Sequence, residues 1–291
     1  MIQAQRDISL AQYTTFKIGG PARYFFAAKT KEDIIKAVGF AQSKKLPYFI
    51  LGGGSNLLVS DKGFKGLVIK INNKQIKADG NNIFAQAGVS LSDLIKLSLE
   101  KSLTGLEWAA GIPGTIGGAI YGNAGSQRGG PSISDIVEEV ILLNPDGQLM
   151  TVDKKWFKFD YRQSRLKNIP EGERPVILSA VLRLRKGNAQ EIRRTIKERL
   201  VIRKKHIPEE PSAGCIFKNP PNQSARQLIE QAGLKEKRIG QARISEKQAN
   251  FIINLGGARA KDVLRLIELI KKTIREKFKI ELEEEIQYLG F

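Results

Sequence analysis

Hydrophobic residues in the first fifty positions follow first a helical spacing and then a strand spacing. Ile34, Val38 and Ala41 lie on one face of a helix, and Thr30 can cap the start of that helix. The apolar run at residues 47–51 has the length of a buried strand and leads directly into glycine. Because helix and strand signals alternate, the sequence predicts a mixed α and β fold.

The same alternation continues in the last third of the chain. A basic segment at residues 190–205 predicts a helix that connects two parts of the protein. Beyond it the pattern predicts a helix at 224–234, a strand at 249–254, a long amphipathic helix at 262–278 and a strand at 280–291. Residues 105–130 are rich in glycine, so no regular element is expected there.

The domain boundary is expected at the basic segment, since 291 residues suggest roughly two domains. We predict a first domain at residues 1–186, with two lobes at about 1–72 and 73–186. Residues 187–291 are expected to form the connector helix and the second domain.

Composition narrows the possible chemistry. The chain is 41% hydrophobic and 27% charged, which is typical of a soluble globular protein. No apolar run reaches the ~20 residues that span a bilayer, and the first residues lack a signal-peptide apolar region, so a cytoplasmic protein without membrane contact is expected. One cysteine excludes an intrachain disulfide, and one histidine, His206, disfavours a Ser-His-Asp triad or a metal site. Carboxylates, arginine, lysine, hydroxyls, the thiol or a cofactor must therefore carry the chemistry.

A net charge of +18 indicates anionic partners, and the basic charge is dense at residues 183–205. Two interpretations are open. Ile192, Ile196 and Leu200 form an apolar stripe, so the basic residues can simply cover the solvated face of a helix. A nucleic-acid groove is less favoured, because no aromatic residues are interleaved for base stacking. Abundant Lys, Arg and Glu also suit a heat-adapted chain.

Two glycine-rich segments are candidates for a cofactor site. LGGGSN at 51–56 follows the predicted strand, and GIPGTIGGAIYGNAG at 111–125 contains six glycines. Glycine lets backbone N–H groups approach an anion closely, so such loops suit a pyrophosphate. Neither segment matches GxGxxG before a helix or GxxxxGK[ST]. Two tight turns needed only for folding are the alternative, but two such loops together favour a nucleotide cofactor.

Seven motifs in order carry a family resemblance: YTTFKIGGPA (13–22), LGGGSNLLVSDKGFKGLVI (51–69), GLEWAAGIPGTIGGAIYGNAG (105–125), FDYRQSRL (159–166), PSAGCIFKNP (211–220), ISEKQANFIIN (244–254) and LEEEIQYLG (282–290). Together they resemble the UDP-N-acetylenolpyruvylglucosamine reductase (MurB) family over nearly the whole chain. The short span between YRQS and the basic helix is similar to the compact second type of this family.

The resemblance implies an α+β fold. Residues 1–186 would form a two-lobed FAD-binding module of the vanillyl-alcohol-oxidase (PCMH) kind, and residues 187–291 would hold the smaller α+β substrate-binding domain. The implied enzyme uses NADPH to reduce FAD. The reduced flavin then converts UDP-N-acetylenolpyruvylglucosamine to UDP-N-acetylmuramate, a precursor of peptidoglycan. No metal and no nucleic acid is expected.

The family chemistry assigns three catalytic residues. Hydride adds at C3 of the enolpyruvyl group, so negative charge develops on C2 and its carboxylate and needs donors. By resemblance, Arg162 and Glu285 stabilise that charge, with Glu285 protonated. The family places a serine at the position of Cys215, so the thiol would protonate C2. A buried spectator thiol, with another donor or a water protonating C2, is the alternative.

Two details qualify this assignment. In a terminal strand, Leu282, Glu284 and Ile286 share one face, so the pattern alone favours Glu284, whereas the family motif favours Glu285. Two departures from the family, a longer connection at 126–135 and Gln248 in place of a common histidine, touch no proposed donor.

The resemblance also assigns ligand-binding residues. The residues expected to bind FAD are Gly52, Gly53, Gly54, Ser55, Asn56, Gly111, Ile112, Pro113, Gly114, Thr115, Gly118, Asn123 and Gly125. Lys218, Asn219 and Arg203 are expected to bind the UDP-sugar substrate. Lys204 and Lys205 are equally placed for its phosphates, and the sequence does not choose among the three basic residues.

Two rival functions remain. A related flavin oxidase would share the FAD module but would not be expected to carry PSAGCIFKNP and LEEEIQYLG. A basic nucleic-acid-binding protein would lack flavin absorption. The sequence does not determine the oligomeric state, for which a monomer is favoured, or the preference between NADPH and NADH. It also leaves open the rates and the pH dependence that Cys215 brings.

Overall fold

The computed structural model describes residues 2–126 and 128–291, and chain contacts divide it into two compact units. Unit 1 comprises Met1–Gln5, Tyr24–Gly53 and Gly66–Arg203, and unit 2 comprises Arg6–Arg23, Gly54–Lys65 and Lys204–Phe291. Each unit thus combines segments that are distant in sequence, and the glycine-rich loop at 51–56 contributes to both. The division into functional domains at residues 1–186 and 187–291 stays a prediction about binding roles.

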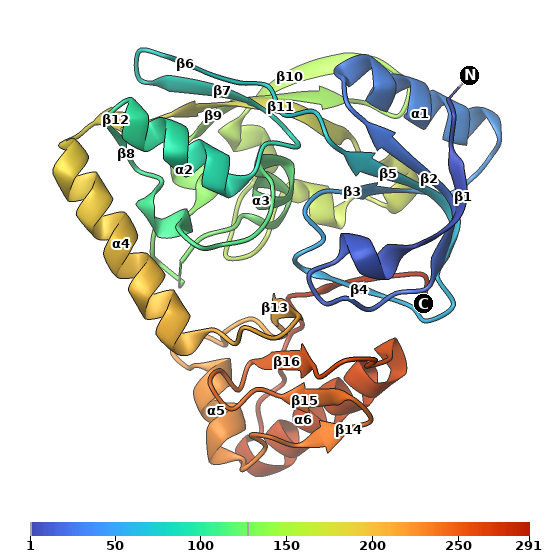
Figure 1. The fold of residues 1–291 in the computed structure, drawn as a ribbon, viewed down its shortest axis with the longest axis vertical. Coiled ribbons are helices and arrows are strands. Elements are labelled where there is room, and N and C mark those ends of the chain that lie inside the picture. The colour runs from blue at the N-terminus through green and yellow to red at the C-terminus, as the bar shows by residue number, and fades with distance from the viewer. Residues whose placement is uncertain (1, 127) are drawn as a thin grey trace. The chain divides into compact units, whose positions relative to one another are not determined.

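Two larger sheets organise the chain up to residue 183 (Figure 1). The first has the order β1-β2-β5-β3, formed by Gln5–Ser9, Pro21–Ala28, Phe64–Ile71 and Tyr48–Leu51. The second has the order β10-β9-β11-β7-β6, formed by Leu149–Asp153, Val137–Leu143, Val176–Arg183, Asn82–Gln86 and Ile76–Asp79. Its neighbours are all antiparallel, whereas β3 runs parallel to β5. A short pair joins β8, Leu103–Thr104, to β12, Arg185–Lys186.

Four helices accompany these sheets: α1 (Lys31–Ser43), α2 (Leu91–Glu100), α3 (Ile116–Gly122) and α4 (Ala189–His206). Thr30 caps α1 through the Asp33 N–H, and Ile34, Val38 and Ala41 are buried, which confirms the predicted helix. The helix predicted in the basic segment is likewise confirmed as α4.

The expectation that residues 105–130 contain no regular element was wrong, because α3 lies within them. Thr115 caps this helix by accepting a hydrogen bond from Gly118 N. Ile116 and Ile120 are fully buried. Burying a large aliphatic side chain contributes about 1.5–3 kcal/mol, which outweighs the cost of about 1 kcal/mol for each glycine in a helix.

Unit 2 is a four-stranded sheet with two helices against it (Figure 1). Its order β13-β16-β15-β14 is formed by Ser212–Cys215, Phe251–Asn254, Ala242–Ile244 and Arg238–Ile239. The helices are α5 (Ala225–Gln231) and α6 (Ala260–Phe278), which confirm the helices predicted there, and β16 confirms the predicted strand. The parallel pair of β4, Leu57–Val59, with β17, Gln287–Leu289, also lies in unit 2, as do residues Arg6–Arg23.

The strand predicted at residues 280–291 is much shorter than expected. Only Gln287–Leu289 forms a strand, and Lys279 ends α6 with a positive φ of 59°. Between them the chain makes single contacts to other segments, including an isolated bridge between Phe217 and Glu284. Leu282 and Ile286 are nevertheless buried, so the alternation of apolar and polar residues was correct although its element was not.

Candidate functional site

The two glycine-rich segments meet in unit 1. A Cβ on Gly53 would lie 2.8 Å from Gly114 Cα, and a Cβ on Gly52 would lie 2.8 Å from Thr115 Oγ1. Side chains at these positions would separate the two segments, so the close approach requires glycine. The structure thus brings together the two glycine-rich segments that were predicted from the sequence to bind one nucleotide cofactor.

Lys70 supports this approach from the neighbouring strand β5, because its ammonium donates a hydrogen bond to Gly52 O. Burial lowers the pKa of Lys70, and the charge of Lys74 lowers it further. The sequence interpretation missed this residue. Its signal was a lysine inside the otherwise apolar strand LVIKI.

Gly111 is covered by helix α4. A Cβ at Gly111 would lie 2.8 Å from Arg203 Cδ and 3.2 Å from Leu200 Cδ2. Arg203, predicted to contact substrate phosphate, therefore packs its aliphatic stem against the second glycine-rich segment. Ile112, Pro113 and Gly118 belong to the same segment, and the Gly118 N–H is used by the cap of α3.

Asn123 ends α3 in the left-handed conformation and has one half of its amide unpaired. Its Nδ2 donates to Asp160 O at 2.7 Å, whereas its buried Oδ1 has no protein partner. Ser126 Oγ is buried in the same way. A buried acceptor without a donor is costly, so a ligand hydroxyl or N–H would stabilise it.

Gly125 has a packing role, because a Cβ there would lie 2.6 Å from Ser132 Cβ.

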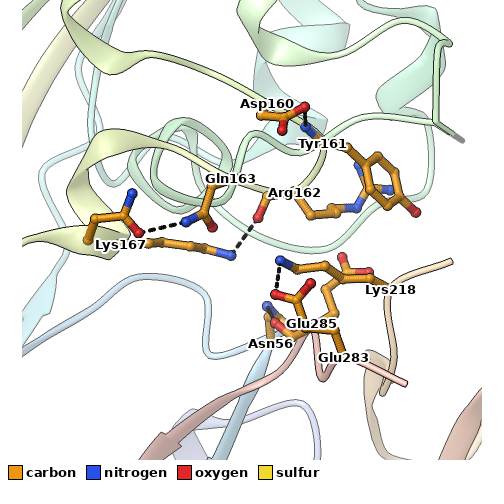
Figure 2. Close-up of polar contacts among 10 residues, drawn as sticks. Asn56, Asp160, Tyr161, Arg162, Gln163, Lys167, Lys218, Glu283 and Glu285 are labelled. Carbon is orange, nitrogen blue, oxygen red and sulfur yellow. Dashed lines mark hydrogen bonds and ion pairs between the residues drawn. The ribbon is translucent and has the colours of Figure 1, made fainter. Parts of the chain in front are cut away.

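Arg162 occupies a strained turn in unit 1. Asp160 and Gln163 close the turn by exchanging backbone hydrogen bonds, and Arg162 has a φ of 55°. Its Nη2 donates to Gly125 O at 2.9 Å and to Ser126 O at 2.7 Å. Figure 2 shows Lys167, whose Nζ donates to Arg162 O at 2.8 Å. These contacts fix the side chain and the backbone of Arg162 together.

Cys215 and Glu285 lie on neighbouring segments of unit 2. The Glu285 N–H donates to Ile216 O at 2.7 Å, next to Cys215 at the end of β13. The cysteine forms no disulfide and is only partly buried, and its role as proton donor or spectator stays a prediction. Asn56 Nδ2 donates to Glu285 O at 3.0 Å, and Ser55 O lies 3.9 Å from the Cβ position of Gly214. The end of the first glycine-rich loop therefore borders both candidate donors.

Lys218 and Asn219, which are proposed to bind the substrate, are held by contacts within unit 2. Lys218 N donates to Glu283 O at 2.8 Å, and the two side chains form an ion pair, which Figure 2 shows. The Lys218 side chain is 12% exposed and that of Glu283 is 72% exposed. Asn219 Oδ1 accepts from Ala225 N at 3.0 Å and so orders the start of α5. Their roles toward substrate stay predictions.

Among the described residues no cluster of His, Cys, Asp and Glu could hold a metal ion. None of the helices in those residues is long and apolar enough to cross a membrane.

The comparisons with known proteins agree with this arrangement. Residues 22–153 match the FAD binding domain family, and residues 206–289 match the family of the C-terminal domain of UDP-N-acetylenolpyruvoylglucosamine reductase. Fold, glycine loops and matches together define an FAD-binding oxidoreductase of α+β architecture, as predicted. UDP-N-acetylenolpyruvoylglucosamine reductase from Caldanaerobacter subterraneus subsp. tengcongensis is 42% identical over 97% of this chain and 92% of the relative. The chain belongs to the UDP-N-acetylenolpyruvoylglucosamine reductase family, so the resemblance is confirmed.

Two further proteins support this membership. The enzyme of the same name from Caldicellulosiruptor bescii is 43% identical over 99% of this chain and 91% of its own length. The crystal structure of UDP-N-acetylenolpyruvylglucosamine reductase (MurB) from Thermus caldophilus matches with a TM-score of 0.85, at 36% identity and covering all of both chains. The similarity therefore includes both predicted domains.

Proposed function

We propose that this chain reduces UDP-N-acetylenolpyruvoylglucosamine to UDP-N-acetylmuramate with NADPH and FAD, as a cytoplasmic step of peptidoglycan precursor synthesis. The observation that carries the proposal is the contact of the Cys215 segment with Glu285 in unit 2, in a chain of this family. In this proposal residues 1–186 hold FAD, and residues 187–291 bind the UDP-sugar.

The residues of unit 1 fit an FAD pyrophosphate and its attached groups. Gly52 and Gly53 leave no side chain between the two loops, and Asn123 Oδ1 is a buried acceptor that needs a donor. The bound cofactor would supply the hydride-transfer chemistry between NADPH and the double bond of the substrate. The protein's task is to bind both molecules and to compensate the charge that this delivery creates.

Arg162 is proposed to bind the substrate carboxylate. A planar guanidinium holds a carboxylate bidentately, and the bonds from Nη2 to Gly125 O and Ser126 O fix the plane of this one. Because the side chain is ordered before substrate binds, little rotamer entropy is lost on binding.

Glu285 and Cys215 are proposed as proton-bearing groups. A protonated Glu285 carboxyl would donate a hydrogen bond to the developing negative charge, which an ionised carboxylate would repel. The Cys215 Sγ–H would give its proton to C2 of the substrate, which completes the lactyl ether. Lys218, Asn219 and Arg203 are proposed to bind the UDP part, and the protein is proposed to act as a monomer.

Separate measurement of the two half-reactions tests the proposal. The purified protein should be yellow, lose its colour with NADPH under anaerobic conditions and regain it when the enolpyruvyl substrate is added. Arg162→Ala should keep the first change and slow the second. A reduced flavin that UDP-N-acetylenolpyruvoylglucosamine does not reoxidise would overturn the assignment.

A further inference from the structure

Asn56 makes two hydrogen bonds to the segment that carries Glu285. Its Nδ2 donates to Glu285 O at 3.0 Å, and its own backbone O accepts from Gln287 N at 3.0 Å. Figure 2 shows the Asn56 side chain beside Glu285. Asn56, which the family resemblance assigns to FAD binding, is thus bonded to the backbone of Glu285 and of Gln287, the residues on either side of Ile286.

The other side of Glu285 is bonded to the Cys215 segment. The Glu285 N–H donates to Ile216 O at 2.7 Å, so both backbone polar groups of Glu285 have partners in other parts of unit 2. Two fixed points on either side of its Cα set the direction of the Cα–Cβ bond. They therefore limit the region that the Glu285 carboxyl can reach.

Regular secondary structure does not provide this orientation. Residues 279–286, all of which the structure describes, form neither helix nor strand, and their one ladder contact is the bridge between Phe217 and Glu284. In a regular strand the neighbouring ladder bonds would orient Glu285 without help. Here the Asn56 amide supplies the hydrogen bond on the C-terminal side.

We propose that Asn56 is a positioning residue for Glu285 and acts in substrate reduction, not in flavin binding. This inference rests on the proposed function. An amide nitrogen that is bonded to the protein's own carbonyl orients that carbonyl, and a displaced Glu285 would no longer face the developing charge. The part of the glycine-rich loop that approaches Gly114 and Thr115 is Gly52–Gly53, not Asn56.

The holoenzyme with Asn56→Ala or Asn56→Asp tests this inference. Asp has the same size but places an acceptor against Glu285 O. Flavin content and the rate of flavin reduction by NADPH should stay at wild-type values. Reoxidation by saturating enolpyruvyl substrate should slow by about 10- to 100-fold, the effect of a small misplacement of a reacting group. Asn81→Asp in the exposed hairpin between β6 and β7 is the matched control and should change neither step.

A double-mutant cycle separates positioning from general destabilisation. If Asn56 acts through Glu285, Asn56→Ala should slow reoxidation by less than about 3-fold in a Glu285→Gln background. Full additivity would overturn the inference, as would loss of flavin with normal reoxidation of the remaining holoenzyme. If Asn56→Ala does not fold, Asn56→Ser keeps a short donor and is measured in the same way. A wild-type rate for Glu285→Gln alone would contradict the proposed role of Glu285 itself, and this inference with it.

Discussion

Lys271 Nζ lies 2.7 Å from Glu284 Oε1, which ties helix α6 to the segment that bears Glu285. The second oxygen of Glu284 accepts a hydrogen bond of 2.5 Å from Tyr288 Oη. Both carboxylate oxygens of Glu284 therefore have partners within unit 2. This arrangement gives Glu284 a structural role, and Glu285 as the acid of the proposed reaction stays a prediction.

Glu284→Gln should affect stability, whereas Glu285→Gln should affect the rate of substrate reduction. Glu284→Gln loses the ion pair with Lys271 and the charge that strengthens the Tyr288 hydrogen bond, which should lower the free energy of unfolding by about 1–2 kcal/mol. Glu285→Gln should slow flavin reoxidation by the substrate with little change in stability. Urea denaturation and stopped-flow reoxidation measure the two effects. A slow reoxidation in Glu284→Gln alone would show that the family motif was assigned to the wrong glutamate.

Tyr288 should make stability fall at alkaline pH. Burial raises the pKa of Tyr288 above its usual value of 10.0, and the hydrogen bond and charge of Glu284 raise it further. Below pH 10 the tyrosine is neutral in both the folded and the unfolded protein, so its full contribution to stability is present. As pH rises above 10 it ionises only in the unfolded protein, which favours unfolding by up to about 1.4 kcal/mol per pH unit.

Tyr288→Phe removes this dependence. Between pH 9.5 and 11 its free energy of unfolding should fall less steeply than that of wild type, although below pH 9 it should be the less stable protein because the bond to Glu284 is lost. Glu284→Gln should also reduce the slope, since two of the causes of the shift come from Glu284. Urea midpoints at each pH measure it, and parallel slopes in wild type and Tyr288→Phe would contradict the prediction.

Gly53→Ala should weaken FAD binding. The new Cβ would lie 2.8 Å from Gly114 Cα, so the two glycine-rich segments would have to separate. Gly39→Ala in α1 is a matched control because a Cβ there meets nothing within 4 Å. It should keep flavin and gain about 0.5–1 kcal/mol in stability from the better helix propensity. Flavin absorbance per protein and equilibrium dialysis measure the effect, and a fully loaded Gly53→Ala protein would show that the cofactor lies elsewhere.

Local patterns predicted the elements that have strong caps and clear periodicity. The cap residue Thr30 and the apolar face at 34–41 correctly predicted helix α1, and the apolar face at 262–278 correctly predicted helix α6. Helix α3 was missed because its glycines have low helix propensity, and only tertiary burial of Ile116 and Ile120 shows why it forms. The alternation at 282–288 placed Glu284 correctly on the same face as the buried Leu282 and Ile286. The sequence could not show that the Glu284 carboxylate would pair with Lys271 and accept a hydrogen bond from Tyr288.

The site was predicted by residue type and family motif, whereas its supporting contacts were not. A lysine inside an apolar strand singled out Lys70, but residue spacing did not indicate that it would bind Gly52 O, that Lys167 would bind Arg162 O or that Asn56 would bind Glu285 O. These are long side chains or amides bonded to backbone carbonyls. Such bonds depend on the three-dimensional path of the chain, which residue spacing does not encode.

Cys215 should act as the proton donor to C2 of the substrate. The thiol is not in a disulfide and is partly exposed at the end of β13, next to Ile216, whose carbonyl accepts a hydrogen bond from the Glu285 N–H. Cys215→Ala should leave flavin reduction by NADPH intact and slow substrate reduction by about 10²–10⁴, the usual cost of removing a positioned general acid. Cys215→Ser should recover much of that rate, because a hydroxyl would occupy the same position.

The pH dependence of reoxidation distinguishes a thiol donor from a spectator. Cysteine thiols in model peptides ionise near pH 8.5, whereas serine hydroxyls do not ionise in the accessible range. Wild type should therefore lose rate at alkaline pH as the thiol gives up its proton, and Cys215→Ser should lack that loss. Stopped-flow reoxidation of prereduced enzyme from pH 6 to 10 compares the two proteins, with flavin reduction by NADPH as the internal control. Identical pH profiles for wild type and Cys215→Ser, or full activity in Cys215→Ala, would show that another group or a water protonates C2.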